Sequence, residues 1–276
     1  MKPAPTWEPG PAWLFCPGDR PDRFSKAFDR ADVVILDLED AVPPGRKQAA
    51  RTAVAAARID AHRCVVRISG AGTAAHEADL AAVRNMPGIR VMLAKTETAA
   101  QLDGLGDVLG DVPVIAIIES PVGAHCLPEI AASPVLAGLA WGAEDLVAGL
   151  GGTSSRRADD RYRDVVREVR SRTLLAAKAH GLLAIDAIHA DIEDVSGLRA
   201  ECDDAVASGF DATMAVHPLQ VPVIRDAYRP SAQALARARR LLEHVSDGQG
   251  VATFEGQMVD GPMYAMARRI LRRAGR

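Results

Sequence analysis

Residues 31–42 read ADVVILDLEDAV, an apolar run that ends in three closely spaced acids. Val33–Leu38 is rich in β-branched residues and shows no polar alternation, which is typical of a strand buried on both faces of a parallel sheet. Similar runs recur along the chain, separated by stretches rich in Ala, Arg and Glu. These runs are Ala12–Cys16, Cys64–Ile68, Val91–Ala94, Val114–Ile118, Leu139–Trp141, Leu183–Ile188 and Thr213–Val216.

Eight strands that alternate with helices predict a single (β/α)8 TIM barrel, an α/β fold. A doubly wound open sheet is the alternative. The count of eight favours the barrel, and so does the lack of a dinucleotide-binding glycine motif after the first run. We expect helices over Pro44–Arg58 and Asp159–His180, and Thr98 is a candidate cap for another. The apolar face of the longer helix is predicted to consist of Val165, Val169, Leu174 and Ala177.

The chain continues beyond the last predicted strand. Ser231–His244 has the pattern of an amphipathic helix, Ser246–Gly250 is polar like a linker, and Val251–Arg276 forms a tail. We therefore expect a catalytic barrel domain over residues 1–230. Residues 231–276 are expected to form a C-terminal helix and lid that contacts a neighbouring subunit.

Composition excludes several classes of protein. The 276 residues include 33 Lys and Arg against 36 Asp and Glu, a net charge of −3, and only 4% aromatic residues. Such a chain lacks the basic footprint and the stacking platform of nucleic-acid-binding proteins. Its apolar runs fall short of the roughly 18 residues of a membrane span, and Met1–Pro11 lacks the apolar region of a signal peptide. We expect a cytoplasmic protein with no nucleic-acid or membrane partner.

The four cysteines lie far apart, with no C-x-x-C pair. This spacing predicts neither a disulfide framework nor a zinc site. Reduced thiols agree with a cytoplasmic location.

Ionisable residues follow most of the predicted strands. Because the loops after the strands of a barrel open on one face, these side chains are expected to converge there. Glu119 and Asp145, which follow the fifth and sixth runs, are the oxygen ligands that Mg²⁺ prefers. The alternative is that each is a buried acid paired with Arg67 or Lys95.

Several motifs resemble those of the HpcH/HpaI aldolase superfamily, in its citrate lyase β-subunit and malyl-CoA lyase group. They occur in order from residue 14 to residue 262 and so cover nearly the whole chain. The motifs are LFCPGDRP (14–21), ADVVILDLEDAV (31–42), VVRI (65–68), VMLAK (91–95), IIESPVG (117–123), GAEDL (142–146), HPLQ (217–220), YRPS (228–231) and GQMVDGP (256–262).

The resemblance implies that Glu119 and Asp145 bind Mg²⁺, with Glu119 also facing the substrate. It gives Arg67 a catalytic and substrate-binding role, in contact with the acyl carboxylate or the oxygen of the keto product; a guanidinium suits a carboxylate because of its fixed two-pronged geometry. Glu39 and Asp40 would support this site by orienting metal-bound water or Arg67. For these two acids a purely structural salt bridge is the alternative.

Asp260 lies in the tail motif. By resemblance, it reaches from a lid into the site of a neighbouring subunit of a homotrimer and acts there as the catalytic acid or base. From the residues alone, Asp260 before Gly261-Pro262 is typical of a turn.

The sequence departs from the family pattern at Ala94, where proline is usual, and at Thr213, where lysine is common. The second departure puts in doubt a contact to the thioester carrier. For Lys95 we expect a structural ion pair rather than a Schiff base.

The activity implied is a Mg²⁺-dependent carbon–carbon lyase that cleaves a 3-hydroxyacyl-CoA thioester of the citryl-, malyl- or citramalyl-CoA class into an acyl-CoA and an oxo-acid. The alternatives are a thioesterase on the same acyl-CoAs, a pyruvate-type aldolase that uses free oxo-acids, and a non-catalytic subunit of a citrate lyase complex.

Overall fold

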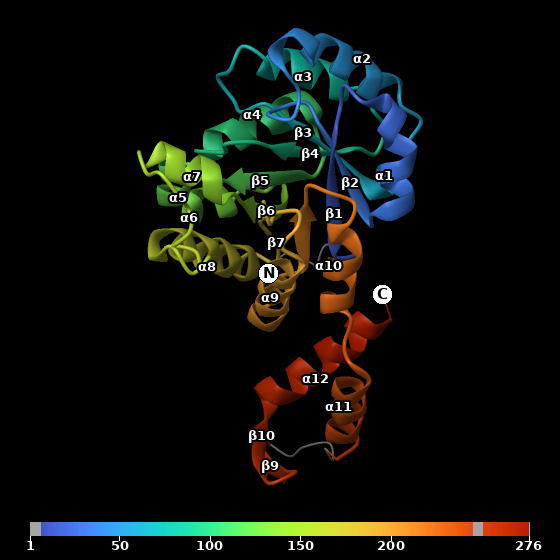
Figure 1. Ribbon diagram of the computed structural model, residues 1–276, viewed down its shortest axis with the longest axis vertical. Helices are drawn as coiled ribbons and strands as arrows, with labels where there is room; N and C mark the ends of the chain where they lie inside the picture. Colours follow the sequence, from blue (N-terminus) through green and yellow to red (C-terminus); the bar gives the residue numbers. More distant parts are fainter. Residues whose placement is uncertain (1–6, 245–250, 276) are drawn as a thin grey trace. The chain divides into compact units, whose positions relative to one another are not determined.

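Eight parallel strands close into a barrel in the computed structural model, which describes residues 7–244 and 251–275 (Figure 1). Each strand pairs with the next, and β8 pairs with β1. The predicted TIM barrel is confirmed, and the open sheet is excluded. The strands are β1 Ala12–Pro17, β2 Val33–Asp37, β3 Cys64–Ile68, β4 Arg90–Leu93, β5 Val114–Ile118, β6 Leu136–Trp141, β7 Leu183–Asp186 and β8 Ala212–Ala215.

Helices connect and surround these strands. Thr98 caps α4 as predicted, because its side chain accepts a hydrogen bond from the backbone of Gln101 in a reciprocal capping box. The helices of this part of the chain are α1 Phe24–Arg30, α2 Lys47–Ala56, α3 His76–Val83, α4 Ala99–Leu109, α5 Pro121–His125, α6 Leu127–Ala131, α7 Ala143–Gly149, α8 Asp164–Ala179, α9 Val195–Ser208 and α10 Gln220–Tyr228. Short 3-10 turns are η1 Pro21–Arg23, η2 Pro44–Arg46 and η3 Ala61–Arg63.

The prediction of a helix from Asp159 is wrong at its start. Residues 155–163, which we call the strap, double back on themselves through a bridge between Arg156 and Tyr162. Asp160 at the turn has a φ of 59°, a conformation that a continuing helix cannot contain. The helix therefore begins at Asp164.

This later start also corrects the predicted apolar face of α8. Val166 is buried, whereas Val165 is 44% exposed. Val169 and Ala177 are buried as predicted. The other predicted helix also differs, because Pro44–Arg46 is a 3-10 turn and α2 covers Lys47–Ala56.

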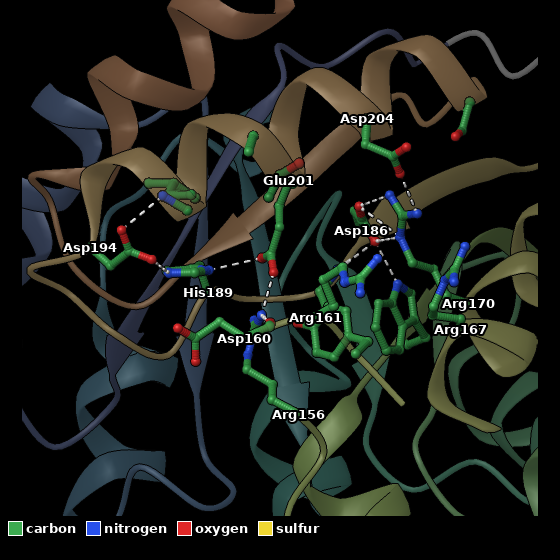
Figure 2. Close-up of a pocket in the computed structure, with 18 of the residues that line it drawn as sticks. Arg156, Asp160, Arg161, Arg167, Arg170, Asp186, His189, Asp194, Glu201 and Asp204 are labelled. Carbon is green, nitrogen blue, oxygen red and sulfur yellow. Dashed lines mark hydrogen bonds and ion pairs between the residues drawn. The ribbon is translucent and has the colours of Figure 1, made fainter. Parts of the chain in front are cut away.

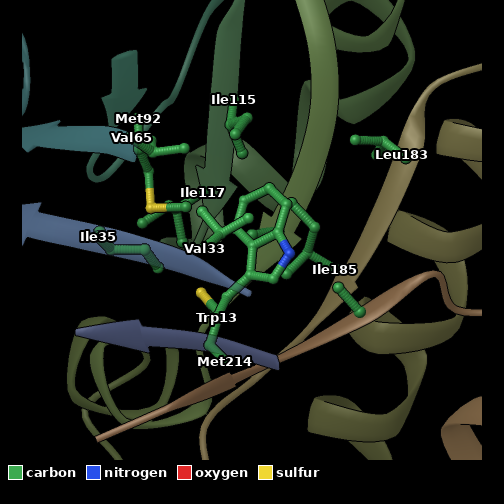
Figure 3. Packing of buried hydrophobic residues seen from close by; sticks show 12 residues of the cluster. Trp13, Val33, Ile35, Val65, Met92, Ile115, Ile117, Leu183, Ile185 and Met214 are labelled. Carbon is green, nitrogen blue, oxygen red and sulfur yellow. The ribbon is translucent and has the colours of Figure 1, made fainter. Parts of the chain in front are cut away.

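The barrel interior is filled by apolar side chains from all eight strands, with Trp13, Met92 and Met214 among the largest (Figure 3). The period of two places alternate residues of a strand on the same face. Val33 and Ile35 belong to this cluster, as do Ile115 and Ile117. The same alternation, extended toward the strand ends, brings Asp37, Arg67 and Glu119 to the interior side of the barrel mouth.

The chain divides into two compact units, Met1–Ile224 and Arg225–Arg276. In the second, α11 Ala232–His244 confirms the predicted amphipathic helix, and a hairpin of β9 Val251–Phe254 and β10 Gln257–Asp260 leads into α12 Gly261–Ala274. A separate core holds this unit together, formed by Ala238, Leu241, Phe254, Val259, Tyr264 and Ala267.

Two predictions about the organisation of the chain, the linker and the domain boundary, are not tested by the structure. The predicted linker Ser246–Gly250 falls outside the described residues, and the boundary after residue 230 stays a prediction. Across residues 7–244 and 251–275, no helix has both the length and the apolar character needed to cross a membrane.

Candidate active site

Glu119 directly follows β5 and is buried at the barrel mouth. The backbone N–H of Lys95 donates to its Oε1 at 2.8 Å. Burial, with a smaller contribution from the neighbouring carboxylate of Asp145, raises the pKa of Glu119 to about 7, against the lowering effects of the Lys95 backbone N–H and of Arg67. Gly142 leaves room for this side chain, since a Cβ there would lie 2.7 Å from Oε2 of Glu119.

Asp145 lies in the first turn of α7 and lines the same cavity as Glu119 and Arg67. Its side chain is 41% exposed, and its Oδ1 lies 3.4 Å from Nζ of Lys95. Oε2 of Glu119 accepts no hydrogen bond from the part of the chain that the structure describes. One buried and one accessible carboxylate on a shared cavity fit a Mg²⁺ ion, which usually keeps several waters beside one or two protein carboxylates.

No larger metal-binding group occurs among the described residues. Within residues 7–244 and 251–275, no three or more His, Cys, Asp or Glu side chains are arranged to hold a metal ion. The donor set here is therefore a pair, which leaves coordination positions for water and substrate.

Arg67 lies on β3, and its guanidinium contacts two carboxylates of the protein. Its Nε donates to Oδ1 of Asp37 at 2.7 Å, and its Nη2 to Oδ2 at 2.5 Å. Nη1 lies 3.2 Å from Glu39. The two-pronged edge of Arg67, which was predicted to face the substrate, thus contacts Asp37. A substrate has to approach the guanidinium from its Nη1 side.

Asp37 was not among the predicted site residues. The available signal was its place on β2 in the same alternation as Val33 and Ile35. Its carboxylate also accepts from the backbone N–H groups of Glu39 and Ala41, so it shapes the loop after β2.

Glu39 and Asp40 meet Lys95. Nζ of Lys95 lies 2.5 Å from Oε1 of Glu39 and 2.9 Å from Oδ2 of Asp40, which confirms the predicted ion-pair role of the lysine. Burial raises the pKa of Glu39, against the lowering effect of Arg67. Lys95 has a φ of 49°, so the backbone is strained where it directs its N–H at Glu119. Whether the two acids also orient metal-bound water stays a prediction.

The rest of the cavity wall is mostly apolar and closes against the strap. Arg156 and Tyr162 of the strap line the cavity together with Trp141. Sequence reasoning missed both strap residues, because Arg156 belongs to no predicted element or motif and Tyr162 was placed inside the predicted helix. Further lining residues include Phe15, Ile117, Ile188, Ala190 and Met214.

Asp260 belongs to the second unit, at the end of β10. It occupies the N-cap position of α12, but its side chain makes no capping hydrogen bond. The turn-capping alternative therefore gains no support from the local contacts. Its predicted place in the site of a neighbouring subunit stays a prediction.

The protein is a (β/α)8 barrel, and an arginine and several carboxylates lie at the carboxyl ends of its strands. This end of the barrel is the usual location of active sites in the fold. The chain belongs to the HpcH/HpaI aldolase/citrate lyase family, whose sequence pattern matches residues 12–218. The family predicted from the motifs is confirmed.

Relatives of known name match nearly the full chain. A citrate lyase subunit beta-like protein of Mycobacterium tuberculosis is 54% identical over 266 residues, 96% of this chain and 96% of that protein. A (3S)-malyl-CoA thioesterase of Cereibacter sphaeroides is 33% identical over 270 residues, 95% of this chain and 93% of that protein.

Among solved structures, the CitE protein of Mycobacterium tuberculosis in complex with magnesium, acetoacetate and coenzyme A superposes with a TM-score of 0.92. It is 54% identical, and the match covers 97% of this chain and 99% of that chain. A citrate lyase β subunit from M. tuberculosis, complexed with oxaloacetate and magnesium, is 55% identical at a TM-score of 0.78, over 80% of this chain and 98% of that chain.

Proposed function

We propose that the protein is a Mg²⁺-dependent carbon–carbon lyase that cleaves a 3-hydroxyacyl-CoA of the citryl-, malyl- or citramalyl-CoA class into an acyl-CoA and an oxo-acid. The observation that carries the proposal is the pair Glu119 and Asp145 on one cavity beside Arg67. The magnesium and coenzyme A complex of the M. tuberculosis relative supports it.

Glu119 and Asp145 would hold the ion, and Mg²⁺ would supply positive charge for the hydroxyl and carboxylate of the acyl group. In the cleavage a base takes the proton of that hydroxyl, and the oxygen forms the carbonyl group of the oxo-acid. The adjacent carbon–carbon bond breaks, and its electron pair becomes the enolate of the thioester. Arg67 stabilises negative charge on the oxo-acid side from its Nη1 side. Asp260 is assigned the proton transfer to the enolate carbon, from a neighbouring subunit of a homotrimer.

The burial of Arg67 and Glu119 suits this chemistry. Charges in a site shielded from water interact more strongly than exposed ones, so a fixed guanidinium stabilises a developing oxyanion without reorganising. Asp37 keeps Arg67 in place for that task through its two short contacts.

A thioesterase is the second candidate, because malyl-CoA thioesterases of C. sphaeroides match across 95% of the chain. In that reaction water attacks the acyl carbon of the same substrates. The products distinguish the two, since hydrolysis releases the intact hydroxy acid and no oxo-acid.

A mass-resolved assay against citryl-, malyl- and citramalyl-CoA, with Mg²⁺ and with a chelator, tests the proposal. We expect an oxo-acid and an acyl-CoA only when Mg²⁺ is present. Cleavage of a free hydroxy-oxo-acid without thioester would favour the pyruvate-type aldolase, and no turnover of any panel member would favour the non-catalytic subunit.

Glu119→Ala is expected to abolish both Mg²⁺ binding and turnover. Glu129→Gln, on the exposed side of α6, is the matched control and should leave both unchanged. Undiminished Mg²⁺ binding by the Glu119 variant would refute the assignment of the metal site.

A further inference from the structure

Arg156 of the strap stands between two cavities of the barrel unit. With Trp141 and Tyr162 it lines the candidate active-site cavity, and the same three residues line a second cavity of about 610 Å³ beside β7, α8 and α9 (Figure 2). Arg156, Tyr162 and Trp141 thus form a wall that the two cavities share, and the strap contributes the first two of these residues.

The guanidinium of Arg156 is held firmly in that wall. Its Nη1 donates to Oε1 of Glu201 at 2.6 Å and to the carbonyl of Asp160 at 2.7 Å. The group also lies 4.1 Å from the ring centre of Tyr162, which meets Trp141 edge-on at 5.4 Å. A cation fixed in this way loses little conformational entropy when it binds a ligand.

The hydrogen bonds of the Arg156 guanidinium to described residues all use Nη1, so Nε and Nη2 keep donors for another acceptor. The other guanidinium on the active-site cavity, Arg67, already pairs with Asp37 and Glu39. The remaining wall offers no further cation among the described lining residues.

The substrates of the proposed reaction differ at one carbon. In citryl-, citramalyl- and malyl-CoA, the carbon that carries the hydroxyl bears a carboxymethyl group, a methyl group or a hydrogen. A methyl group needs only the apolar wall of Phe15, Ile117, Ile188 and Met214. A second carboxylate in the same place would be costly to bury without a paired cation.

We infer that Arg156 recognises the carboxylate of a carboxymethyl group on the hydroxyl-bearing carbon and so directs the enzyme toward citryl-type thioesters, an assignment that rests on the proposed lyase function. Arg156 is a specificity residue here, because a guanidinium that donates from Nε and Nη2 matches the two oxygens of a carboxylate. The rings of Tyr162 and Trp141 shield that contact from water, and Glu201 and Glu144 are the protein carboxylates that already act on the guanidinium.

The test compares citryl-CoA with citramalyl-CoA, which differ only in that carboxylate. Arg156→Met should lower kcat/KM for citryl-CoA by roughly 10- to 100-fold, the usual loss for one charged hydrogen bond. The value for citramalyl-CoA should change by less than about threefold, because its methyl group needs no cation. Arg157→Met is the matched control, since Arg157 lies on the same strap, pairs with Asp164 at 2.6 Å and is not among the lining residues.

Arg156→Lys keeps the charge but loses the planar pair of donors, so an intermediate loss on citryl-CoA is expected. Thermal unfolding shows whether the methionine variant folds. If it does not, the lysine variant still tests the inference. Equal losses on both thioesters would mean that Arg156 only supports the strap and would overturn the inference. An unmodified enzyme that cleaves citramalyl-CoA but not citryl-CoA would overturn it as well, whereas cleavage of neither would refute the proposed function itself.

Discussion

The position of Glu119 depends on Gly142 as well as on the backbone N–H of Lys95. The backbone of Gly142, with φ −133° and ψ 135°, is open to any residue, so its role is spatial rather than conformational. The carboxylate of Glu119 occupies the space where a side chain at 142 would project. The smallest addition there therefore acts on the proposed metal site and not on the fold.

Gly142→Ala is expected to weaken Mg²⁺ binding roughly tenfold, because the new methyl group displaces Oε2 of Glu119. Isothermal titration with Mg²⁺ measures this loss directly. Gly104→Ala, on α4 with open space around its Cβ, is the control and should leave binding unchanged. Equal affinity in the two variants would show that Glu119 does not hold the ion.

His189 is a single residue that makes the stability of the protein depend on pH. A hydrogen bond to Glu201 raises its pKa, Asp194 adds to the effect, and burial and Arg156 oppose it. Because the folded-state pKa lies above the unfolded value, the ionised contact stabilises the protein fully below about pH 6.5 and is lost as the pH rises through the folded-state pKa.

His189→Gln should therefore destabilise the protein more near pH 5.5 than near pH 8.5. Urea unfolding of both proteins at the two pH values measures the difference. A destabilisation that is independent of pH would show that His189 contributes by packing alone.

At the residue scale, the sequence predicted the acids and Arg67 but not what they contact. Arg67 was expected to offer its two-pronged edge to substrate, yet Asp37 occupies that edge. Both residues were visible in the sequence, but their pairing depends on the register of β2 against β3, where Asp37 lies beside Arg67. A linear pattern does not fix that register.

The strands and helices of the barrel could be predicted wherever the local sequence pattern was clear. Short apolar runs, several of them rich in β-branched residues, marked all eight strands, and Thr98 marked the start of α4. The strap was missed because Arg- and Asp-rich sequence is compatible with a helix. Two contacts hold the strap out of the helix: the bridge between Arg156 and Tyr162, and the hydrogen bond from Arg156 to Glu201, a residue distant in the sequence.

Thr98→Ala is expected to lower the free energy of unfolding by about 1 kcal/mol, because it removes the capping hydrogen bond of α4. Thr52→Ala is a suitable control, since Thr52 is exposed on α2 and only bonds back to the carbonyl of Gln48. Its effect should stay within about 0.5 kcal/mol. Equal losses in urea unfolding would contradict a capping role.

Among the described residues, each of the two compact units has a hydrophobic cluster of its own. The sequence indicated this division, because the eight strand runs end well before the C-terminus and an amphipathic helix follows. The β9–β10 hairpin could not be foreseen from the tail, whose short strands pair only with each other.

Phe254→Ala should loosen the second unit without loosening the barrel. Removing a buried aromatic ring from a small core costs about 3–5 kcal/mol, and the ring packs within residues 225–276. Hydrogen exchange is expected to accelerate in α11, α12 and the hairpin while the β1–β8 amides stay protected. Faster exchange in the barrel strands would show that the two units unfold together.

The strap also has a consequence for how such an enzyme diversifies. Arg156 and Tyr162 come from one short, contiguous segment, whereas Glu119, Asp145 and Arg67 come from three separate parts of the barrel. Replacing that segment with its counterpart from a relative would change which acyl groups fit and leave the reacting centre in place. The proposed role of Arg156 therefore predicts that grafting this single loop transfers the acyl preference.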